Sequence, residues 1–331
     1  MFNLENRRYI GSKADLSDWI LDLIQTNCSG KIFADIFAGT AIISQKAAKI
    51  YPTIIINDFL YSNNVIYHAF FDNNTWNKQK LGNYIEQWNT KDINTLKDNY
   101  FSLNYGGKFF SYNDAKIIGA IRENLANNNK FNEKEKNILL TSLIYSLDKI
   151  ANTVGHYEAY FHNKNLQQQF VYKMICPKPI KDIKIYRKDA NELSKQLRAD
   201  IVYIDPPYNS RQYSRFYHVL ENLVKWNKPK LSGVALKPPA ENMSEYCRAN
   251  APTVFKDLIN NLQCKFIAVS YNNTYNSKSS SSKNKISLEQ IEEILNAKGK
   301  TRHYEHDYKY FNSGKTDFKN HKEFLFITKV K

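Results

Sequence analysis

Short apolar runs rich in β-branched residues occur towards both ends of the chain. The pattern predicts strands at these runs, which are 32–36, 53–57, 183–186, 201–204 and 265–273. A glycine turn and apolar positions at helical spacing, near residues 42–48, follow the first run. A strand, a glycine turn and a helix in this order predict the first unit of a Rossmann-like α/β sheet.

The middle of the chain has a different pattern. Helical periodicity is present at residues 114–125 and 134–150, and no stretch there reads as a strand of a parallel sheet. We therefore expect two parts: a sheet domain made of residues 1–60 and 183–331, and a largely helical insertion at residues 61–182.

The C-terminal part predicts a helix and a hairpin. Residues 286–295 are amphipathic and follow a capping pattern that begins at Ser287. Residues 303–310 and 323–328 are expected to pair as an antiparallel hairpin around residues 312–315. Two loops are predicted from composition: the proline-broken stretch 229–252 and the serine- and lysine-rich stretch 274–285.

Composition adds a candidate class of partner. The 331 residues carry a formal net charge of +15, and 14% of them are aromatic. Positive charge interleaved with aromatic rings suits phosphate contacts combined with base stacking. A basic but unspecialised surface would give the same totals.

Several classes of protein are disfavoured. The four cysteines, Cys28, Cys176, Cys247 and Cys264, have no metal-ligand spacing, so we expect a reducing compartment and no metal site. The N-terminus is polar, and no apolar run approaches the ~20 residues of a membrane helix. We therefore expect a cytoplasmic protein without a membrane partner.

The strand at residues 201–204 stops at Asp205-Pro206-Pro207-Tyr208, the most informative stretch of the chain. Prolines donate no ladder hydrogen bond, and ligands of open α/β sheets lie beyond the carboxyl ends of the strands. The Asp205 carboxylate and the Pro206 carbonyl are two acceptors suited to one planar amine, and Tyr208 offers a ring for stacking. A plain Asp-Pro turn is the alternative.

These four residues resemble the catalytic motif of amino-group methyltransferases that act on adenine in DNA. The chain is similar to the Dam-like (α-group) N6-adenine-specific DNA methyltransferases of restriction–modification systems. The resemblance implies a class I methyltransferase sheet, with helices on both faces and a C-terminal antiparallel hairpin, plus a helical target-recognition domain. It also implies methyl transfer from S-adenosylmethionine to a flipped adenine in duplex DNA, and a cognate restriction endonuclease as a partner.

Cofactor residues are expected in four places. Asp35 to Thr40 looks like the methyltransferase form of the cofactor loop, and Asp58 lies where a Rossmann fold grips ribose. By resemblance, Lys13 contacts the methionine end and Asp189 the adenine amine, although Asp189 also fits a helix N-cap. The full expected set is Tyr9, Gly11, Lys13, Asp35, Phe37, Gly39, Thr40, Asp58, Phe59, Asp189 and Ala190.

Residues near DNA are expected from resemblance and from position. The segment 148–157 resembles one found in these methyltransferases. The segment 210–215 follows residues 205–208, which are called the proline corner below. Solvated arginines beside a helix cap are an equally good interpretation of the second segment, and Arg122 is expected to face solvent. The expected DNA-binding set is Asn152, Thr153, His156, Arg211, Tyr213, Arg215, Tyr271 and Asn272.

Two other functions remain open from the sequence. An RNA or protein amino-group methyltransferase would use a related corner, although such relatives more often carry Asn at the position of Asp205. A DNA-binding protein with a vestigial catalytic half is the second alternative. The complete set of motif residues argues against that decay.

Overall fold

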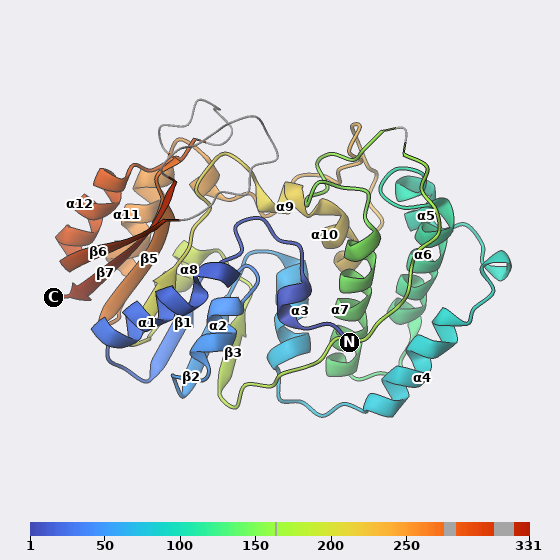
Figure 1. Cartoon of the computed structure of the whole chain (residues 1–331), viewed down its shortest axis with the longest axis horizontal. Coiled ribbons are helices and arrows are strands. Elements are labelled where there is room, and N and C mark those ends of the chain that lie inside the picture. Colours follow the sequence, from blue (N-terminus) through green and yellow to red (C-terminus); the bar gives the residue numbers. More distant parts are fainter. Residues whose placement is uncertain (163, 275–282, 308–320) are drawn as a thin grey trace. The chain divides into compact units, whose positions relative to one another are not determined.

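The computed structural model describes residues 1–162, 164–274, 283–307 and 321–331 (Figure 1). Its contacts divide the chain into two compact units. The sheet unit consists of residues 12–59, 181–213 and 242–331, and the helical unit of residues 1–11, 60–180 and 214–241.

A mixed sheet of seven strands forms the centre of the sheet unit, in the order β3-β2-β1-β4-β5-β7-β6 (Figure 1). Strands β1 to β5 are parallel, and β7 runs antiparallel to both of its neighbours. The strands are β1 (Ile32–Asp35), β2 (Thr53–Asn57), β3 (Ile183–Tyr186), β4 (Ile201–Ile204), β5 (Phe266–Asn272), β6 (Gly299–Asp307) and β7 (Lys322–Val330). The predicted Rossmann-like methyltransferase sheet is confirmed.

Helices cover both faces of this sheet, because successive side chains of a buried strand point to opposite faces. On one face, Ala34, Val202 and Val269 pack into the core formed with α8, α11 and α12. On the other face lie α1 and α2. The helices are α1 (Ser17–Asn27), α2 (Ile42–Ala47), α8 (Ala190–Ser194), α11 (Ala251–Asn261) and α12 (Leu288–Lys298).

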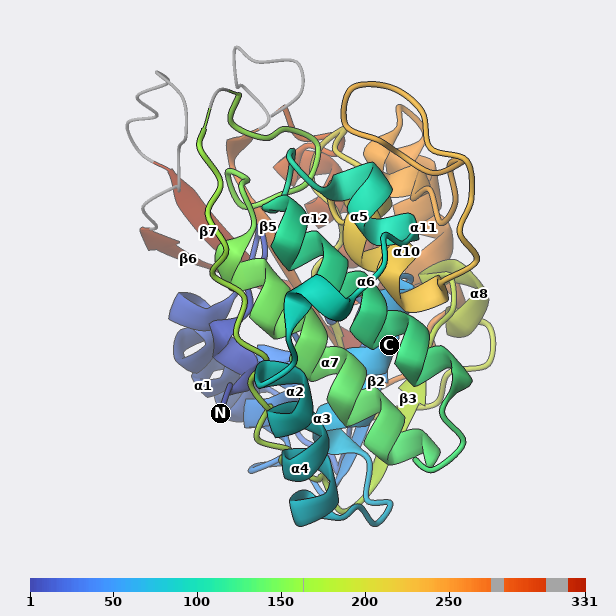
Figure 2. The same cartoon turned by 90° about the vertical axis from the view of Figure 1, so that its right-hand side faces the viewer.

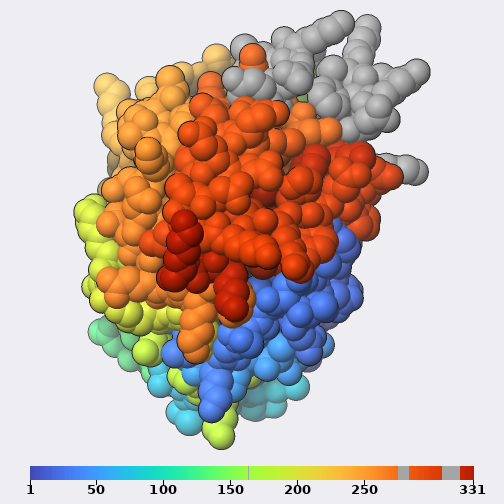
Figure 3. Space-filling model, turned by 90° about the vertical axis from the view of Figure 1, so that its left-hand side faces the viewer, coloured from blue at the N-terminus to red at the C-terminus, as the bar shows by residue number. Residues whose placement is uncertain are grey.

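The C-terminal elements agree with the predicted ones. Ser287 caps α12 by accepting a hydrogen bond from the Gln290 backbone, and β6 pairs with β7 as an antiparallel pair. The Tyr304 hydroxyl of β6 donates to Asn27 at 2.9 Å, and the C-terminal strands (red) lie against the α1 region (blue) on the face shown in Figure 3. The predicted hairpin turn at 312–315 and most of the serine-rich loop lie outside the described residues.

The helical unit is built around α6 and α7, which lie side by side in Figure 2 and contact each other. Asn132 caps α7, and its side chain accepts from the Glu135 backbone. The predicted helical stretches 114–125 and 134–150 correspond to α6 and α7. The helices are α3 (Tyr61–Phe71), α4 (Lys78–Asn89), α5 (Tyr100–Tyr105), α6 (Tyr112–Asn127), α7 (Glu133–Ile150), α9 (Tyr213–Phe216) and α10 (His218–Lys225).

Residues 1–11 and 214–241 pack within the helical unit, although the sequence analysis grouped them with the sheet domain. The Phe2 backbone pairs with Met174 and Cys176, and Glu221 accepts hydrogen bonds from the backbone amides of Tyr61 and Ser62. These contacts join segments that are far apart in the sequence. Local periodicity carries no information about them.

The proline-broken stretch 229–252 is loop up to Asn250, apart from a 3-10 turn at Glu245–Cys247, and α11 begins at Ala251 with a proline in its first turn. One expectation from the sequence was wrong. Arg122 is buried rather than solvated, and it donates to the carbonyls of Leu223 (2.6 Å) and Val224 (2.9 Å). Within the described residues, no helix has the length and apolar character needed to span a bilayer.

Candidate active site

Three carboxylates follow adjacent strands at the carboxyl edge of the parallel sheet. Asp58 comes after β2, Asp35 ends β1, and Asp205 comes after β4. The strand order reverses between β1 and β4, which is where open α/β sheets bind ligands. The charges of Asp205 and Asp58 both raise the pKa of Asp35, so the three groups lie within electrostatic reach of one another.

Asp205 belongs to a buried cluster with Lys13, Tyr208 and Glu323. The Lys13 ammonium lies 3.1 Å from Asp205 Oδ1, 3.1 Å from Glu323 Oε1 and 2.9 Å from the Tyr208 hydroxyl oxygen. The Tyr208 hydroxyl lies 2.6 Å from Asp205 Oδ1 and 2.8 Å from Glu323 Oε1. Lys13 therefore has its ionic partners in Asp205 and Glu323, and its predicted contact with the methionine end of the cofactor stays a prediction.

The charges of this cluster are mutually dependent. Burial raises the pKa of Asp205, and the Glu323 carboxylate raises it further, while Lys13 and the Tyr208 hydroxyl lower it. Burial opposes the positive charge of Lys13, but the two carboxylates outweigh burial and raise the lysine pKa above its ordinary value. Lys13 thus remains an ammonium and stabilises the ionised form of Asp205.

Hydrogen bonds from Tyr271 and Lys285 hold the proline corner in place. The Tyr208 carbonyl accepts hydrogen bonds from the Lys285 backbone (2.7 Å) and from the Tyr271 hydroxyl (3.3 Å). Tyr271 is fully buried, and its ring centroid lies 4.4 Å from that of Tyr208. Asn272 is turned into a buried network with Thr274 and Asn284. Both residues support the corner and the segment that follows β5.

The cofactor loop after β1 is shaped by a positive-φ glycine. Gly39 has φ 53°, a conformation that costs glycine little, and its backbone N–H donates to Asp58 Oδ2 at 3.0 Å. Ala41 follows with φ 60° immediately before α2. The loop thus closes over the end of β2, with its backbone amides near two carboxylates.

Asp35 is the group in this loop that most clearly lacks a counterion. Its Oδ2 accepts from the Ser44 hydroxyl at 2.7 Å, whereas Oδ1 is buried and makes no hydrogen bond within the described residues. Burial raises the pKa of Asp35 to about 7, and the Ser44 hydrogen bond offsets part of that rise. A cationic ligand group at Oδ1 would satisfy the orphaned oxygen.

A third segment is joined to this edge through Asn57 at the end of β2. The Asn57 amide donates to the carbonyls of Ile36 (3.0 Å) and Lys188 (3.1 Å), and its oxygen accepts from the Lys188 backbone. Asp189 then caps α8 by accepting from the backbone amides of Asn191 and Glu192. The predicted N-cap role of Asp189 is confirmed. Its predicted contact with the adenine amine of the cofactor stays a prediction.

Other expected residues of the sheet unit lie around this edge. Phe37 packs edge-on against Tyr246, and Phe59 is half-buried. The Arg211 backbone amide donates to the Asn209 side chain, and its carbonyl accepts from Cys247. The remaining members of the set are Thr40 and Ala190, which are buried, and Tyr213, which is half-buried.

The expected residues of the helical unit are anchored within that unit. Tyr9 stacks on Tyr217 with centroids 4.9 Å apart, and Gly11 has φ 79°. Asn152 is buried and donates to the carbonyls of Lys108 and Phe161. Thr153 pairs with Tyr160, His156 stacks on Phe216, and Arg215 donates to the Pro238 carbonyl at 2.8 Å.

Sequence reasoning missed three polar residues of the sheet unit. Glu323 was assigned only to a strand, and Ser44 and Asn57 only to a helix and a strand. Glu323 alone carried a usable sign, because it shares a strand face with the buried residues Leu325 and Ile327. A carboxylate in such a row requires a partner, and only the sheet order shows which one it has.

Comparison of the sequence with known proteins identifies the family to which the chain belongs. A model of the D12 class N6 adenine-specific DNA methyltransferase family matches residues 9–294. The chain is 30% identical to the type II methyltransferase M.NlaIII of Neisseria lactamica, over 95% of both chains. It is 33% identical to the modification methylase StsI of Streptococcus sanguinis, over 80% of this chain and 44% of that protein. It is 31% identical to the type II methyltransferase M.FokI of Planomicrobium okeanokoites, over 88% of this chain and 47% of that protein. The chain belongs to the D12 class of N6 adenine-specific DNA methyltransferases, and it is a site-specific DNA adenine methyltransferase.

Proposed function

We propose that the methyl donor is S-adenosylmethionine and that it binds along the carboxyl ends of β1, β2 and β3. The orphaned Oδ1 of Asp35 suits the donor's ammonium group, and Asp58 suits its ribose hydroxyls. Asp189 lies after the next strand, in position for the adenine amine, and Phe37 and Phe59 offer apolar surface. The donor supplies a methyl group on a sulfonium, which is its own leaving group.

Asp205 and the Pro206 carbonyl then receive the adenine amine. Oδ1 of Asp205 is engaged by Lys13 and Tyr208, whereas Oδ2 has no hydrogen bond within the described residues, and the side chain is 16% exposed. Oδ2 is thus the oxygen that accepts from N6. This fixed Asp205 carboxylate, beside the cofactor loop at the switch point of the sheet, is the observation that carries the proposal.

The chemistry requires alignment more than strong base catalysis. Two acceptors on the amine favour the pyramidal nitrogen, whose lone pair points at the methyl carbon. Holding nitrogen and carbon in line supplies most of the rate gain. As N6 bonds to the methyl carbon, its proton is transferred to Asp205 Oδ2.

The adenine has to leave the duplex first. A stacked base cannot reach a corner at a sheet edge, so we propose that it is flipped, with the Tyr208 ring as a stacking surface. The hydrogen bonds of the Tyr208 hydroxyl fix the plane of that ring. Arg211, Arg215 and Tyr213 are proposed to contact the extruded nucleotide and its phosphates.

We assign target recognition to the helical unit, and in particular to the segment with Asn152, Thr153 and His156. The net charge of +15 supports salt-dependent binding to phosphates. Several relatives are named as type II or modification methyltransferases. On that basis, we propose that the methylation protects DNA from a restriction endonuclease that cleaves the same sequence.

One experiment tests the substrate and the donor together. Purified protein is incubated with S-adenosylmethionine carrying a tritiated methyl group and with duplex DNA, single-stranded DNA, RNA or protein. Label should enter duplex DNA, and single-molecule sequencing of that DNA should show modified adenines within one short word. Label in RNA or protein, or no transfer to any substrate, would overturn the proposal.

A further inference from the structure

Glu323 is a buried carboxylate in a row of apolar residues on the C-terminal strand. Its side chain is 3% exposed, and Leu325 and Ile327 share its face of β7. Burying a carboxylate is costly unless it is paired and hydrogen-bonded. A carboxylate at this position therefore needs partners that satisfy its charge.

Within the described residues, the Glu323 side chain makes its polar contacts with Lys13 and Tyr208. Its Oε1 lies 3.1 Å from the Lys13 ammonium and 2.8 Å from the Tyr208 hydroxyl. The same two groups contact Asp205 Oδ1. Glu323 thus mirrors Asp205 across a shared ammonium and a shared hydroxyl, while being more deeply buried (3% against 16% exposed).

The hydroxyl at the centre has only one hydrogen to donate. It can hydrogen-bond to Asp205 or to Glu323, but not to both carboxylates at once. A charged acceptor forms the stronger hydrogen bond, so the hydrogen follows the ionised carboxylate. While both carboxylates are ionised, the contact to Asp205 Oδ1 is the shorter of the two, 2.6 Å against 2.8 Å to Glu323 Oε1, so Asp205 is the preferred acceptor and its Oδ2 is left for the substrate.

We propose that Glu323 is a positioning residue for methyl transfer. It holds Lys13 and Tyr208 against Asp205. Once Asp205 is protonated, Glu323 accepts the hydrogen bond that the Tyr208 hydroxyl donates. The inference rests on the proposed role of Asp205 in the reaction.

The exchange fits the atom balance of the reaction. N6 bonds to the methyl carbon, the carbon–sulfur bond breaks with its electron pair on sulfur, and one N6 hydrogen moves to Asp205 Oδ2. Asp205 is then neutral and a weaker acceptor. The Tyr208 hydroxyl keeps its hydrogen and donates its hydrogen bond to the Glu323 carboxylate instead. The ammonium of Lys13 contacts both carboxylates throughout.

The ionisable groups around Asp205 give the sign of a pH test. They are Lys13, Asp35, Tyr203, Tyr208 and Glu323. The Glu323 charge raises the pKa of Asp205. Removing that charge should lower the pKa of Asp205, and the acidic limb of the rate profile should move to lower pH.

The test compares Glu323→Gln with the wild type and with Glu305→Gln. Glu305 is a matched control because it lies on the neighbouring strand β6 and is paired with Lys322, but its side chain is 54% exposed. The single-turnover methyl-transfer rate is measured with duplex DNA from pH 5 to 9, and S-adenosylmethionine affinity is measured by calorimetry. A second variant, Glu323→Asp, keeps the charge but withdraws the carboxylate.

Glu323→Gln should lose about tenfold in plateau rate, as a charged acceptor becomes neutral, and its acidic limb should move about 1 pH unit lower. Glu323→Asp should lose rate without moving the limb, and Glu305→Gln should match the wild type. A Glu323→Gln enzyme with the wild-type plateau and limb would overturn the inference, as would a loss of cofactor affinity alone. If Glu323→Gln does not fold, a Glu323→Asp enzyme with the full plateau rate overturns it instead. An inactive wild type would count against the proposed function, which this inference presupposes.

Discussion

The two units of this methyltransferase use buried charges for different purposes. In the sheet unit, Lys13 and Asp205 face each other, and Glu323 joins them. In the helical unit, Lys134 and Arg122 point instead at backbone carbonyls where helices end. The comparison shows that burial of a charge does not identify a reactive site. The groups that the charge faces do.

Lys134 illustrates the structural use. Its ammonium donates to the carbonyls of His68 (2.8 Å), Ala69 (3.0 Å) and Asp72 (2.8 Å), at the end of α3. The last carbonyls of a helix lack partners within the helix, so the lysine satisfies acceptors that burial would otherwise orphan. Burial lowers the pKa of Lys134 to about 8.

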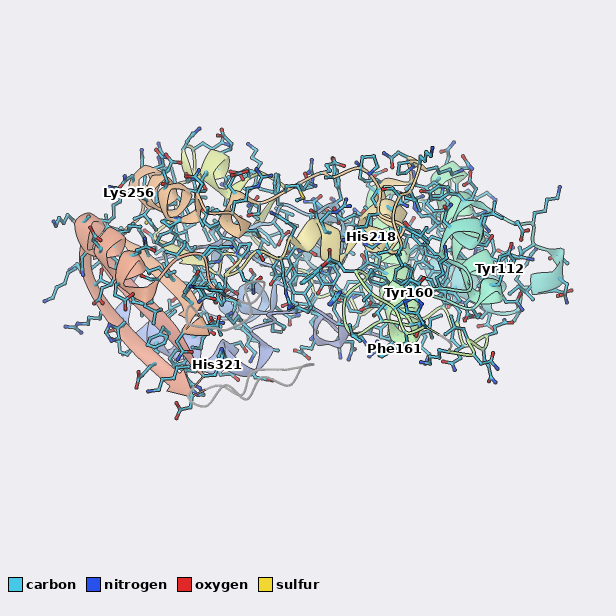
Figure 4. The ribbon with its side chains drawn as sticks, turned by 90° about the horizontal axis from the view of Figure 1, so that it is seen from above. Tyr112, Tyr160, Phe161, His218, Lys256 and His321 are labelled. Carbon is cyan, nitrogen blue, oxygen red and sulfur yellow. The ribbon has the colours of Figure 1, made fainter. Side chains whose placement is uncertain are left out.

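His218 belongs to the same structural group. Its ring nitrogens lie 2.9 Å from the Arg215 carbonyl and 2.7 Å from the Ala235 carbonyl, and Figure 4 shows it within the helical unit. Burial lowers its pKa to about 4, although the two carbonyls favour the charged ring. A fully buried histidine held by backbone on both sides connects segments and has no substrate to act on.

The largest expected effect comes from the sheet unit. Asp205→Ala should lower single-turnover methyl transfer by ~10³-fold, because it removes the acceptor for the reacting amine. Cofactor affinity should stay near the wild-type value in calorimetry. Asp22→Ala, which changes an exposed carboxylate on α1, serves as the control. Full activity in Asp205→Ala would contradict the assignment of the reactive charges to the sheet unit.

Substitution of a buried charge in the helical unit should lower the stability of the protein but leave the methyl-transfer rate unchanged. Lys134→Met orphans carbonyls at the end of α3 and should lower the free energy of unfolding by about 2 kcal/mol in urea titrations. Lys136→Met, on the same helix but more exposed and paired with Glu133 at 3.7 Å, should change it by less than about 0.5 kcal/mol. A lower methyl-transfer rate per folded molecule in Lys134→Met would contradict the comparison.

Cofactor binding should depend on pH through Asp35. Because the pKa of Asp35 is raised to about 7, the carboxyl is largely protonated at pH 5.5 and ionises as the pH rises. A cationic ammonium binds the ionised form, so S-adenosylmethionine affinity should rise roughly tenfold from pH 5.5 to pH 7. Calorimetry on the wild type and on Asp35→Asn tests this. The variant should show no such rise, and a pH-independent wild type would exclude Asp35 as the ammonium partner.

The smallest effect concerns a charge of the sheet unit that lies away from the site. Asp200 accepts from the backbone amides of Lys31 and Ile32 and pairs with Lys265 at 2.8 Å, which together lower its pKa to about 2. This stabilisation is present above the unfolded pKa and is lost as pH falls towards 2. Lys265→Met should cost about 0.5 kcal/mol at pH 7, and less at pH 3, in guanidinium titrations. A loss of methyl transfer in Lys265→Met would contradict the comparison, because Lys265 and Asp200 face no group of the Asp205 cluster.

Local patterns were sufficient for the elements that carry the motifs. The strand before Asp205, the glycine turn at Gly39 and the cap at Ser287 each depend on residues a few positions apart, and each formed as expected. Periodicity, proline and glycine act over one or two turns of chain, so a sequence displays them directly. The α11 helix was not predicted, and the proline in its first turn was assigned to the preceding loop.

Short motifs and their order were enough to predict the fold class, the family and the corner at residues 205–208. The cluster of Lys13, Asp205 and Glu323 became visible only in the folded chain, since these residues lie on three separate segments of the sheet unit. The folded structure also places the Arg122 side chain at the last carbonyls of α10 rather than in solvent. The partner of a polar group depends on strand order and helix packing, which are fixed by long-range contacts that no local pattern records.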